Sequence, residues 1–190
     1  HESKDDSGYT HYLYRNIEGK YVREELPVPQ FPASVVKPFD FDHDGDPDLF
    51  LGSRVKRGMV PHSGPSWLLI NDNGTFSAER TADFDLGMVT DAVWSDVDGD
   101  GWEDLIVARE WNTLTVLKNT GGKEFAVQDI KGFSEKHGLW YSITAGDFDN
   151  DGDDDYIVGN LGDNHRFTIN EKYPMRLYSI DVDLDGNIDP

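Results

Sequence analysis

The chain has 190 residues and a formal net charge of −20, and so acidic a surface argues against nucleic acid as a partner because phosphates would be repelled. It contains no cysteine, which excludes a disulfide framework and a cysteine nucleophile. No apolar run approaches the roughly 18 residues that a transmembrane helix needs. Helical periodicity is nearly absent, and short apolar runs rich in β-forming residues predict an all-β fold.

The first part of the chain alternates predicted strands with turns. Residues 9–26 are predicted to form a hairpin that turns at residues 16–19. Strands at 34–39 and 48–53 flank an acidic loop, and a basic, proline-containing loop follows. A second hairpin turns at Asn73-Gly74, which is a strong short-range turn signal.

The same order of strand, acidic loop, strand and hairpin then recurs. A second round has strands at 91–95 and 104–109 and a hairpin at 114–127, and a third has strands at 141–145 and 156–159. A further strand is predicted at 175–180. The acidic loops begin at residues 40, 96, 147 and 181, and the first two intervals fit a four-stranded unit of about 50 residues, the period of propeller blades.

Each acidic loop has the nine-residue pattern Asp-x-Asp-x-Asp-Gly-x-x-Asp, and together the four contain 20 of the 37 acidic residues. Oxygen ligands at alternate positions, with a glycine at the sixth for a sharp turn, are typical of calcium loops. We therefore predict three to four Ca²⁺ ions, with the seventh residue contributing its backbone carbonyl. The predicted ligands are Asp40, Asp42, Asp44, Asp46, Asp48, Asp96, Asp98, Asp100, Trp102, Asp104, Asp147, Asp149, Asp151, Asp153, Asp155, Asp181, Asp183, Asp185, Asn187 and Asp189.

The pattern differs from an EF-hand in two respects. An EF-hand loop ends with a bidentate glutamate at position 12, where the first three loops have Leu51, Val107 and Val158. Apolar runs of β-forming residues, and no helical pattern, follow these loops. The predicted unit is therefore strand, calcium loop, strand. A single such loop could be a solvated acidic turn, but four copies with the same spacing favour a metal.

Four segments of the chain carry a family resemblance. They are Phe-Asp-Phe-Asp-His-Asp-Gly-Asp-Pro-Asp-Leu-Phe at 39–50, its counterparts at 92–105 and 145–153, and Tyr-Ile-Val-Gly-Asn-Leu-Gly at 156–162. They resemble the FG-GAP or VCBS repeats of integrin-α-like β-propellers, and are similar to those of secreted or surface proteins of Bacteroidetes-type bacteria. The resemblance implies that the calcium loop joins the first and second strands of a blade, with Asp at positions 1, 3, 5 and 9 as ligands. The literal Phe-Gly and Gly-Ala-Pro signatures are absent, which weakens any expectation of integrin-like partners.

We therefore expect one partial β-propeller of about 3.5 four-stranded blades over residues 1–190. An open arc exposes a strand edge and an apolar blade face, so the chain is expected to be a segment of a longer protein, or half of a ring completed by self-association. A compact four-bladed ring closed by its termini is the alternative. The expected units are a half blade at 9–31, blades at 34–80 and 87–130, a short blade at 139–172 and the start of another at 174–190.

The face opposite the calcium loops is expected to carry basic and aromatic residues that could bind a protein or an anionic glycan. The candidate ligand-binding residues are Arg54, Arg109, Trp111, Trp140, His165 and Arg166. The alternative is that the aromatic residues simply pack between blades. His43, at a non-ligand position of the first loop, is expected to be solvated.

No motif of a serine, cysteine or zinc enzyme is present, so no catalytic residue is predicted. Calcium loops suit a calcium-rich environment, which indicates an extracellular, cell-surface or periplasmic location. The expected function is non-catalytic protein or glycan binding by a calcium-binding propeller segment. The alternatives are part of a polysaccharide-active enzyme, such as a calcium-dependent lyase, and a purely structural array.

Overall fold

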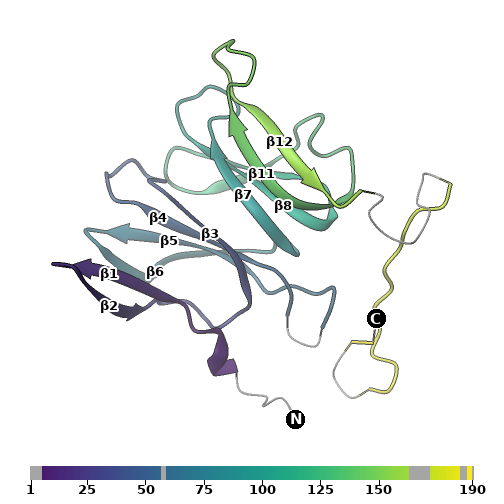
Figure 1. Ribbon diagram of the computed structural model, residues 1–190, viewed down its shortest axis with the longest axis horizontal. Helices are drawn as coiled ribbons and strands as arrows, with labels where there is room; N and C mark the ends of the chain where they lie inside the picture. The colour runs from purple at the N-terminus through teal and green to yellow at the C-terminus, as the bar shows by residue number, and fades with distance from the viewer. Residues whose placement is uncertain (1–5, 57–58, 163–171, 185–187, 190) are drawn as a thin grey trace.

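The structure, a computed structural model, describes residues 6–56, 59–162, 172–184 and 188–189 (Figure 1). Within these residues the protein is all-β apart from one short 3-10 helix, η1 (Asp6–Tyr9). An N-terminal hairpin is formed by β1 (Tyr12–Ile17) and β2 (Lys20–Glu25). The predicted all-β fold is thereby confirmed.

Two sheets and a hairpin follow, and all of their strand pairs are antiparallel. The first sheet has the order β3-β4-β5-β6, and in the second β7 pairs with β8, β8 with β9, and β9 with β10. The hairpin β11-β12 joins the second sheet through two residue pairs between β11 and β8. The bounds are β3 (Ala33–Phe39), β4 (Asp48–Ser53), β5 (Ser66–Asp72), β6 (Thr75–Phe84), β7 (Val89–Ser95), β8 (Asp104–Asn112), β9 (Thr115–Asn119), β10 (Phe125–Gln128), β11 (Gly138–Gly146) and β12 (Asp155–Asn160).

The predicted strand at 175–180 does not form. Of the described residues near the C-terminus, Ile180 makes only an isolated bridge with Asp189. A strand requires a hydrogen-bonded neighbour, and the described residues provide none for 175–179. Figure 1 shows this segment apart from the sheets.

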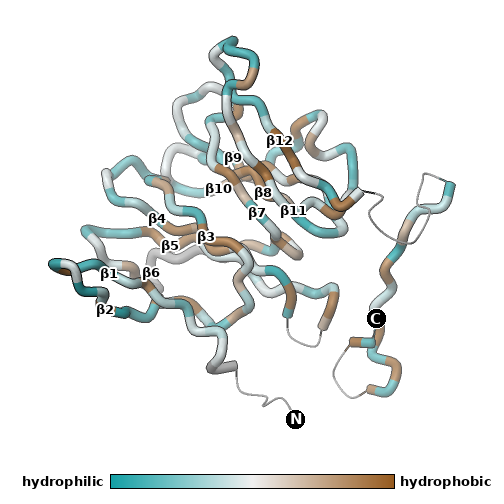
Figure 2. The backbone as a smooth tube through the Cα atoms, viewed as in Figure 1, coloured by the Kyte–Doolittle hydropathy of each residue, from teal (hydrophilic) through white to brown (hydrophobic). Residues whose placement is uncertain are grey.

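The sheets pack face to face through apolar clusters, and the hydrophobic residues concentrate in the strands (Figure 2). In β8 the side chains alternate between two clusters, because successive residues of a strand point to opposite faces. Leu105 and Val107 pack toward the first sheet, whereas Ile106 and Ala108 pack toward the β11-β12 hairpin. All four are fully buried, so the second strand of this sheet is covered on both faces.

The first sheet repeats this arrangement. Phe50 of β4 packs in the cluster shared with β7 and β8, and Leu51 packs in the cluster shared with Leu26 and Phe31 of the N-terminal segment. Both β4 residues have no exposed surface. Each sheet is therefore stabilised mainly by its neighbours in the stack.

The first strands of successive sheets, β3, β7 and β11, are connected by polar side chains. The Lys37 ammonium forms an ion pair with the Asp91 carboxylate at 2.8 Å. The other Asp91 oxygen accepts a hydrogen bond of 3.0 Å from the backbone amide of Ile143. Asp91 thus joins all three strands.

A hydroxyl contact occurs twice at equivalent positions of these strands. The Ser34 and Thr90 hydroxyls each lie within hydrogen-bond distance of a carbonyl in the second strand of the same sheet and one in the first strand of the next. The distances are 3.1 Å to Gly52 and 2.6 Å to Val89 for Ser34, and 3.0 Å to Ala108 and 2.6 Å to Trp140 for Thr90. The relation between successive sheets is therefore the same at both junctions.

The outer face of β12 is exposed, whereas the equivalent faces of β4 and β8 are buried. Ile157 occupies the same position after its acidic loop as Phe50 and Ile106, yet it is 57% exposed. Phe148, which corresponds to the buried Phe41, is 53% exposed. In the described residues this face of the hairpin has no sheet packed on it.

We predict that Ile106→Ala lowers the free energy of unfolding by about 2–5 kcal/mol, because it leaves a cavity between two sheets. Ile157→Ala is the matched control and should cost less than about 1 kcal/mol. Urea unfolding of both variants measures the difference. Equal losses would show that the outer face of β12 is covered in solution.

Candidate metal centres

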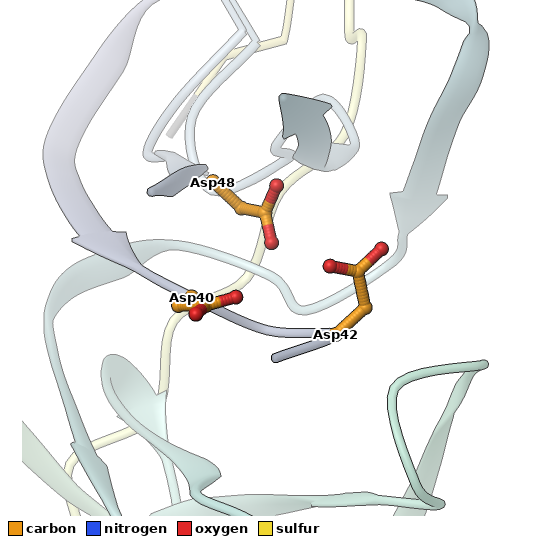
Figure 3. A group of neighbouring side chains, drawn as sticks. All are labelled: Asp40, Asp42 and Asp48. Atoms are coloured by element: carbon orange, nitrogen blue, oxygen red, sulfur yellow. The ribbon is translucent and has the colours of Figure 1, made fainter. Parts of the chain in front are cut away.

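Three carboxylates converge in each of the four acidic loops. In the first loop Asp40, Asp42 and Asp48, at positions 1, 3 and 9, point toward one another (Figure 3) and each offers an oxygen within 4.8 Å of the others. The same positions converge in the other loops, as Asp96, Asp98 and Asp104, Asp147, Asp149 and Asp155, and Asp181, Asp183 and Asp189. The repeated spacing therefore produces a repeated three-carboxylate geometry.

Backbone amides hold the carboxylate of position 1. In the first loop the two oxygens of Asp40 accept hydrogen bonds from the amides of Asp44 (3.1 Å) and Gly45 (3.0 Å), at positions 5 and 6. The second and third loops repeat both bonds, through Asp96 and Asp147. The loop backbone therefore wraps around its own first residue.

This wrapping needs left-handed backbone at two positions. The glycine at position 6 has a positive φ in each of the first three loops, from 87° to 101°. Position 4 is also left-handed, with φ between 57° and 72° at His43, Gly99, Asn150 and Leu184. Glycine and asparagine are the residues that tolerate this conformation best. The left-handed backbone at position 4 was not predicted from the sequence, although Gly99 and Asn150 are a signal for it.

The carboxylate of position 9 connects the loop to its sheet. Asp48 accepts a hydrogen bond of 2.8 Å from the amide of Phe41 in the loop and one of 2.6 Å from the amide of Asn71 in β5. Asp104 makes the corresponding bonds to Val97 (3.3 Å) and to Asn119 in β9 (2.8 Å). Both aspartates are fully buried. In the third and fourth loops Asp155 and Asp189 keep the bond to the loop amide.

Positions 5 and 7 lie outside the three-carboxylate groups. The carboxylates of Asp44, Asp100 and Asp151 each accept a hydrogen bond of 2.9–3.0 Å from the amide of the residue at position 7. These residues are Asp46, Trp102 and Asp153. The remaining predicted ligands of the fourth loop, Asp185 and Asn187, lie outside the described residues.

The donor set fits a hard cation. All of the converging ligands are carboxylate oxygens, which Ca²⁺ prefers, and further oxygens are available from position 7 carbonyls and water. Burial raises the pKa of Asp48 to about 6, with a smaller contribution from the Asp42 and Asp44 carboxylates, against two backbone hydrogen bonds that lower it. Burial likewise raises the pKa of Asp104. A bound cation would relieve this repulsion and desolvation.

The first two loops contact each other. The ring of His43 stacks on the indole of Trp102, with centroids 4.2 Å apart and planes 9° apart, and its Nε2 lies 3.3 Å from Glu103. The side-chain amide of Asn119 donates to the carbonyl of Phe41 at 3.0 Å. His43 is exposed, as expected, with 41% of its side chain accessible, and the neighbouring sheet also brings an indole against one face of its ring.

The residues predicted to bind a partner have different surroundings in the structure. Arg54 forms an ion pair with Glu110 and, with Tyr141, lines a hollow of about 310 Å³ that also includes Ser34 and Thr90. Arg109 donates to the backbone carbonyls of Leu86 (3.0 Å) and Thr113 (3.2 Å). Trp140 packs against the apolar cluster between β8 and β11. Trp111 has a left-handed backbone, with a φ of 61°. His165 and Arg166 lie outside the described residues.

Asp48→Ala should destabilise the protein even in EDTA, because the buried amides of Phe41 and Asn71 lose their acceptor, at about 1–3 kcal/mol each. Asp44→Ala is the control, since its carboxylate is exposed and water can replace the lost bond. Thermal unfolding in EDTA compares the two. If Asp48→Ala is as stable as Asp44→Ala, the buried carboxylate does not support the fold by itself.

Comparison with known families locates the repeat in the sequence. Residues 96–158 match the family model described as an FG-GAP-like repeat. The match begins at the first aspartate of the second acidic loop and ends within β12, so it includes the second and third loops. No curated protein matches the chain. Residues 96–158 are thus similar to an FG-GAP-like repeat, and they lie in an all-β structure with acidic clusters that could bind metal ions.

Proposed function

We propose that this chain is a calcium-binding segment of a β-propeller that binds a protein or glycan outside the cell, without catalysis. The observation that carries the proposal is the recurrence of one carboxylate geometry in all four acidic loops. An FG-GAP-like repeat spans two of these loops. Calcium is the ion best suited to all-oxygen loops of this pattern.

The proposed blades are the β3-β6 sheet, the β7-β10 sheet and the β11-β12 hairpin. The three first strands lie next to one another through Lys37, Asp91 and the Ile143 amide, as the innermost strands of a propeller do. The repeated Ser34 and Thr90 contacts support a constant rotation from one blade to the next. In the assembled ring, the exposed face of Ile157 would be covered by another blade, from the rest of a longer protein or from a second copy of the chain.

Calcium has a structural role in this proposal. The ion is held by the aspartates at positions 1, 3 and 9, and position 9 is tied to the third strand of the first two blades. Binding therefore fixes the connection between the first and second strands on one rim of the propeller. Without metal, the clustered carboxylates repel one another and the loops are less stable.

The proposed partner site is the hollow lined by Arg54, Thr90 and Tyr141. Arg54 is 46% exposed at its side chain and supplies planar donors for a carboxylate or sulfate, and Tyr141 supplies an apolar face. Burial and a hydrogen bond to Glu110 raise the pKa of Tyr141.

An extracellular location follows from the proposed function, because millimolar calcium saturates loops of modest affinity there. No helix within the described ranges is long and apolar enough to cross a membrane.

Calcium at a few millimolar should raise the melting temperature by roughly 10 °C or more over the same protein in EDTA. One site saturated at 100 times its Kd contributes about 2.7 kcal/mol, and several sites act together. Magnesium at the same concentration is the control for ionic strength. An unchanged melting temperature in calcium would mean that the acidic loops do not bind the ion.

Arg54→Ala should weaken binding of an oligogalacturonate, used as an anionic glycan probe, by at least about tenfold, because a charge-assisted hydrogen bond is lost. Arg23→Ala, in β2, is the control for loss of a surface arginine. Isothermal titration calorimetry in calcium measures both. Binding that is equally sensitive to both variants would reflect net charge, and binding that neither variant changes would place the glycan elsewhere.

A further inference from the structure

The second acidic loop contains a cation of its own. Lys118 is the fourth residue of β9, and its ammonium forms an ion pair with the carboxylate of Asp98, at position 3. It also lies 2.9 Å from Oδ2 of Asp100, at position 5. Asp98 is one of the three converging carboxylates of this loop. A protein side chain therefore competes for an oxygen ligand of the proposed metal.

The first loop has no such side chain at the equivalent position. Asn119 and Asn71 are equivalent, because each donates its backbone amide to the buried aspartate at position 9. The residue before Asn119 is Lys118, and the residue before Asn71 is the uncharged Ile70. With partners among the described residues, Asp147, Asp149 and Asp151 of the third loop form no ion pair. The loops share one carboxylate geometry but differ in this neighbour.

The ammonium has two opposing consequences. Without metal it neutralises part of the repulsion among the loop carboxylates, and so keeps the loop in its wrapped conformation. With metal it must leave Asp98 or remain next to a divalent cation, and both options cost binding free energy. The first effect stabilises the metal-free loop, and both effects weaken the affinity for metal.

We propose that Lys118 is an internal counter-ion of the second acidic loop, which lowers the calcium affinity of this loop and makes its structure less dependent on calcium. The proposal rests on the proposed calcium binding of the loops. It assigns regulation of one site to a residue outside the nine-residue motif.

The position 6 glycines provide a separate probe for each loop. The amides of Gly45, Gly101 and Gly152 each donate to the position 1 aspartate of their own loop. Their amide resonances in ¹⁵N-labelled protein should shift when that aspartate binds calcium. A titration followed by two-dimensional NMR therefore yields one midpoint per loop.

In Lys118→Met the Gly101 midpoint should fall roughly tenfold, as expected for removal of one charge beside the ion, while the other two midpoints stay in place. The same variant should melt at a lower temperature in EDTA. Lys20→Met, in β2, is the matched control, and Lys118→Arg should keep the Gly101 midpoint at its wild-type value.

The outcomes separate this inference from the proposed function. If Gly45 and Gly152 titrate but the Gly101 midpoint is the same in Lys118→Met and wild type, the inference is wrong and calcium binding stands. If none of the three glycines responds to calcium in the wild type, the proposed calcium binding itself fails. Lys118→Gln, which still donates hydrogen bonds without charge, gives the same test if the methionine variant does not fold.

Discussion

The structure depends most on the buried aspartates that end the first two acidic loops. Asp48 and Asp104 have no exposed surface, and each accepts one amide from its loop and one from the third strand of its sheet. Burying a carboxylate is costly unless its oxygens are hydrogen-bonded. These bonds therefore do more than orient a metal ligand, because they fix where the loop ends relative to the sheet.

The sheets depend on one another in a second way. In β8 alternate residues face opposite neighbours, and its first five side chains are buried. A strand of this kind has no solvent face, so its burial depends on the neighbours on both sides, as in other repeat architectures. The polar contacts of Ser34, Thr90 and Asp91 then determine how successive sheets are placed around their first strands.

The same packing explains why chemically similar residues have different environments. Phe41 packs on the ring of Phe125 from the next sheet at 4.8 Å, whereas Phe148 at the equivalent position is half exposed. His43 stacks on Trp102 for the same reason, since the first loop borders the second. Neither contact is encoded within the loop itself.

The sequence by itself determined the local features. The strands at 34–39, 48–53, 91–95 and 104–109 were predicted within a few residues, because alternation and flanking turns are short-range signals. The spacing predicted that the carboxylates at positions 1, 3, 5 and 9 converge, and those at positions 1, 3 and 9 do so, whereas position 5 lies outside the group. Only the tertiary structure decided the rest: the strand predicted at 175–180 has no partner in the described residues, and Arg109 is engaged by two carbonyls. Lys118 reaches the second loop from 14 residues beyond Asp104. Contacts between residues far apart in the chain depend on how the sheets stack, and no local pattern contains that information.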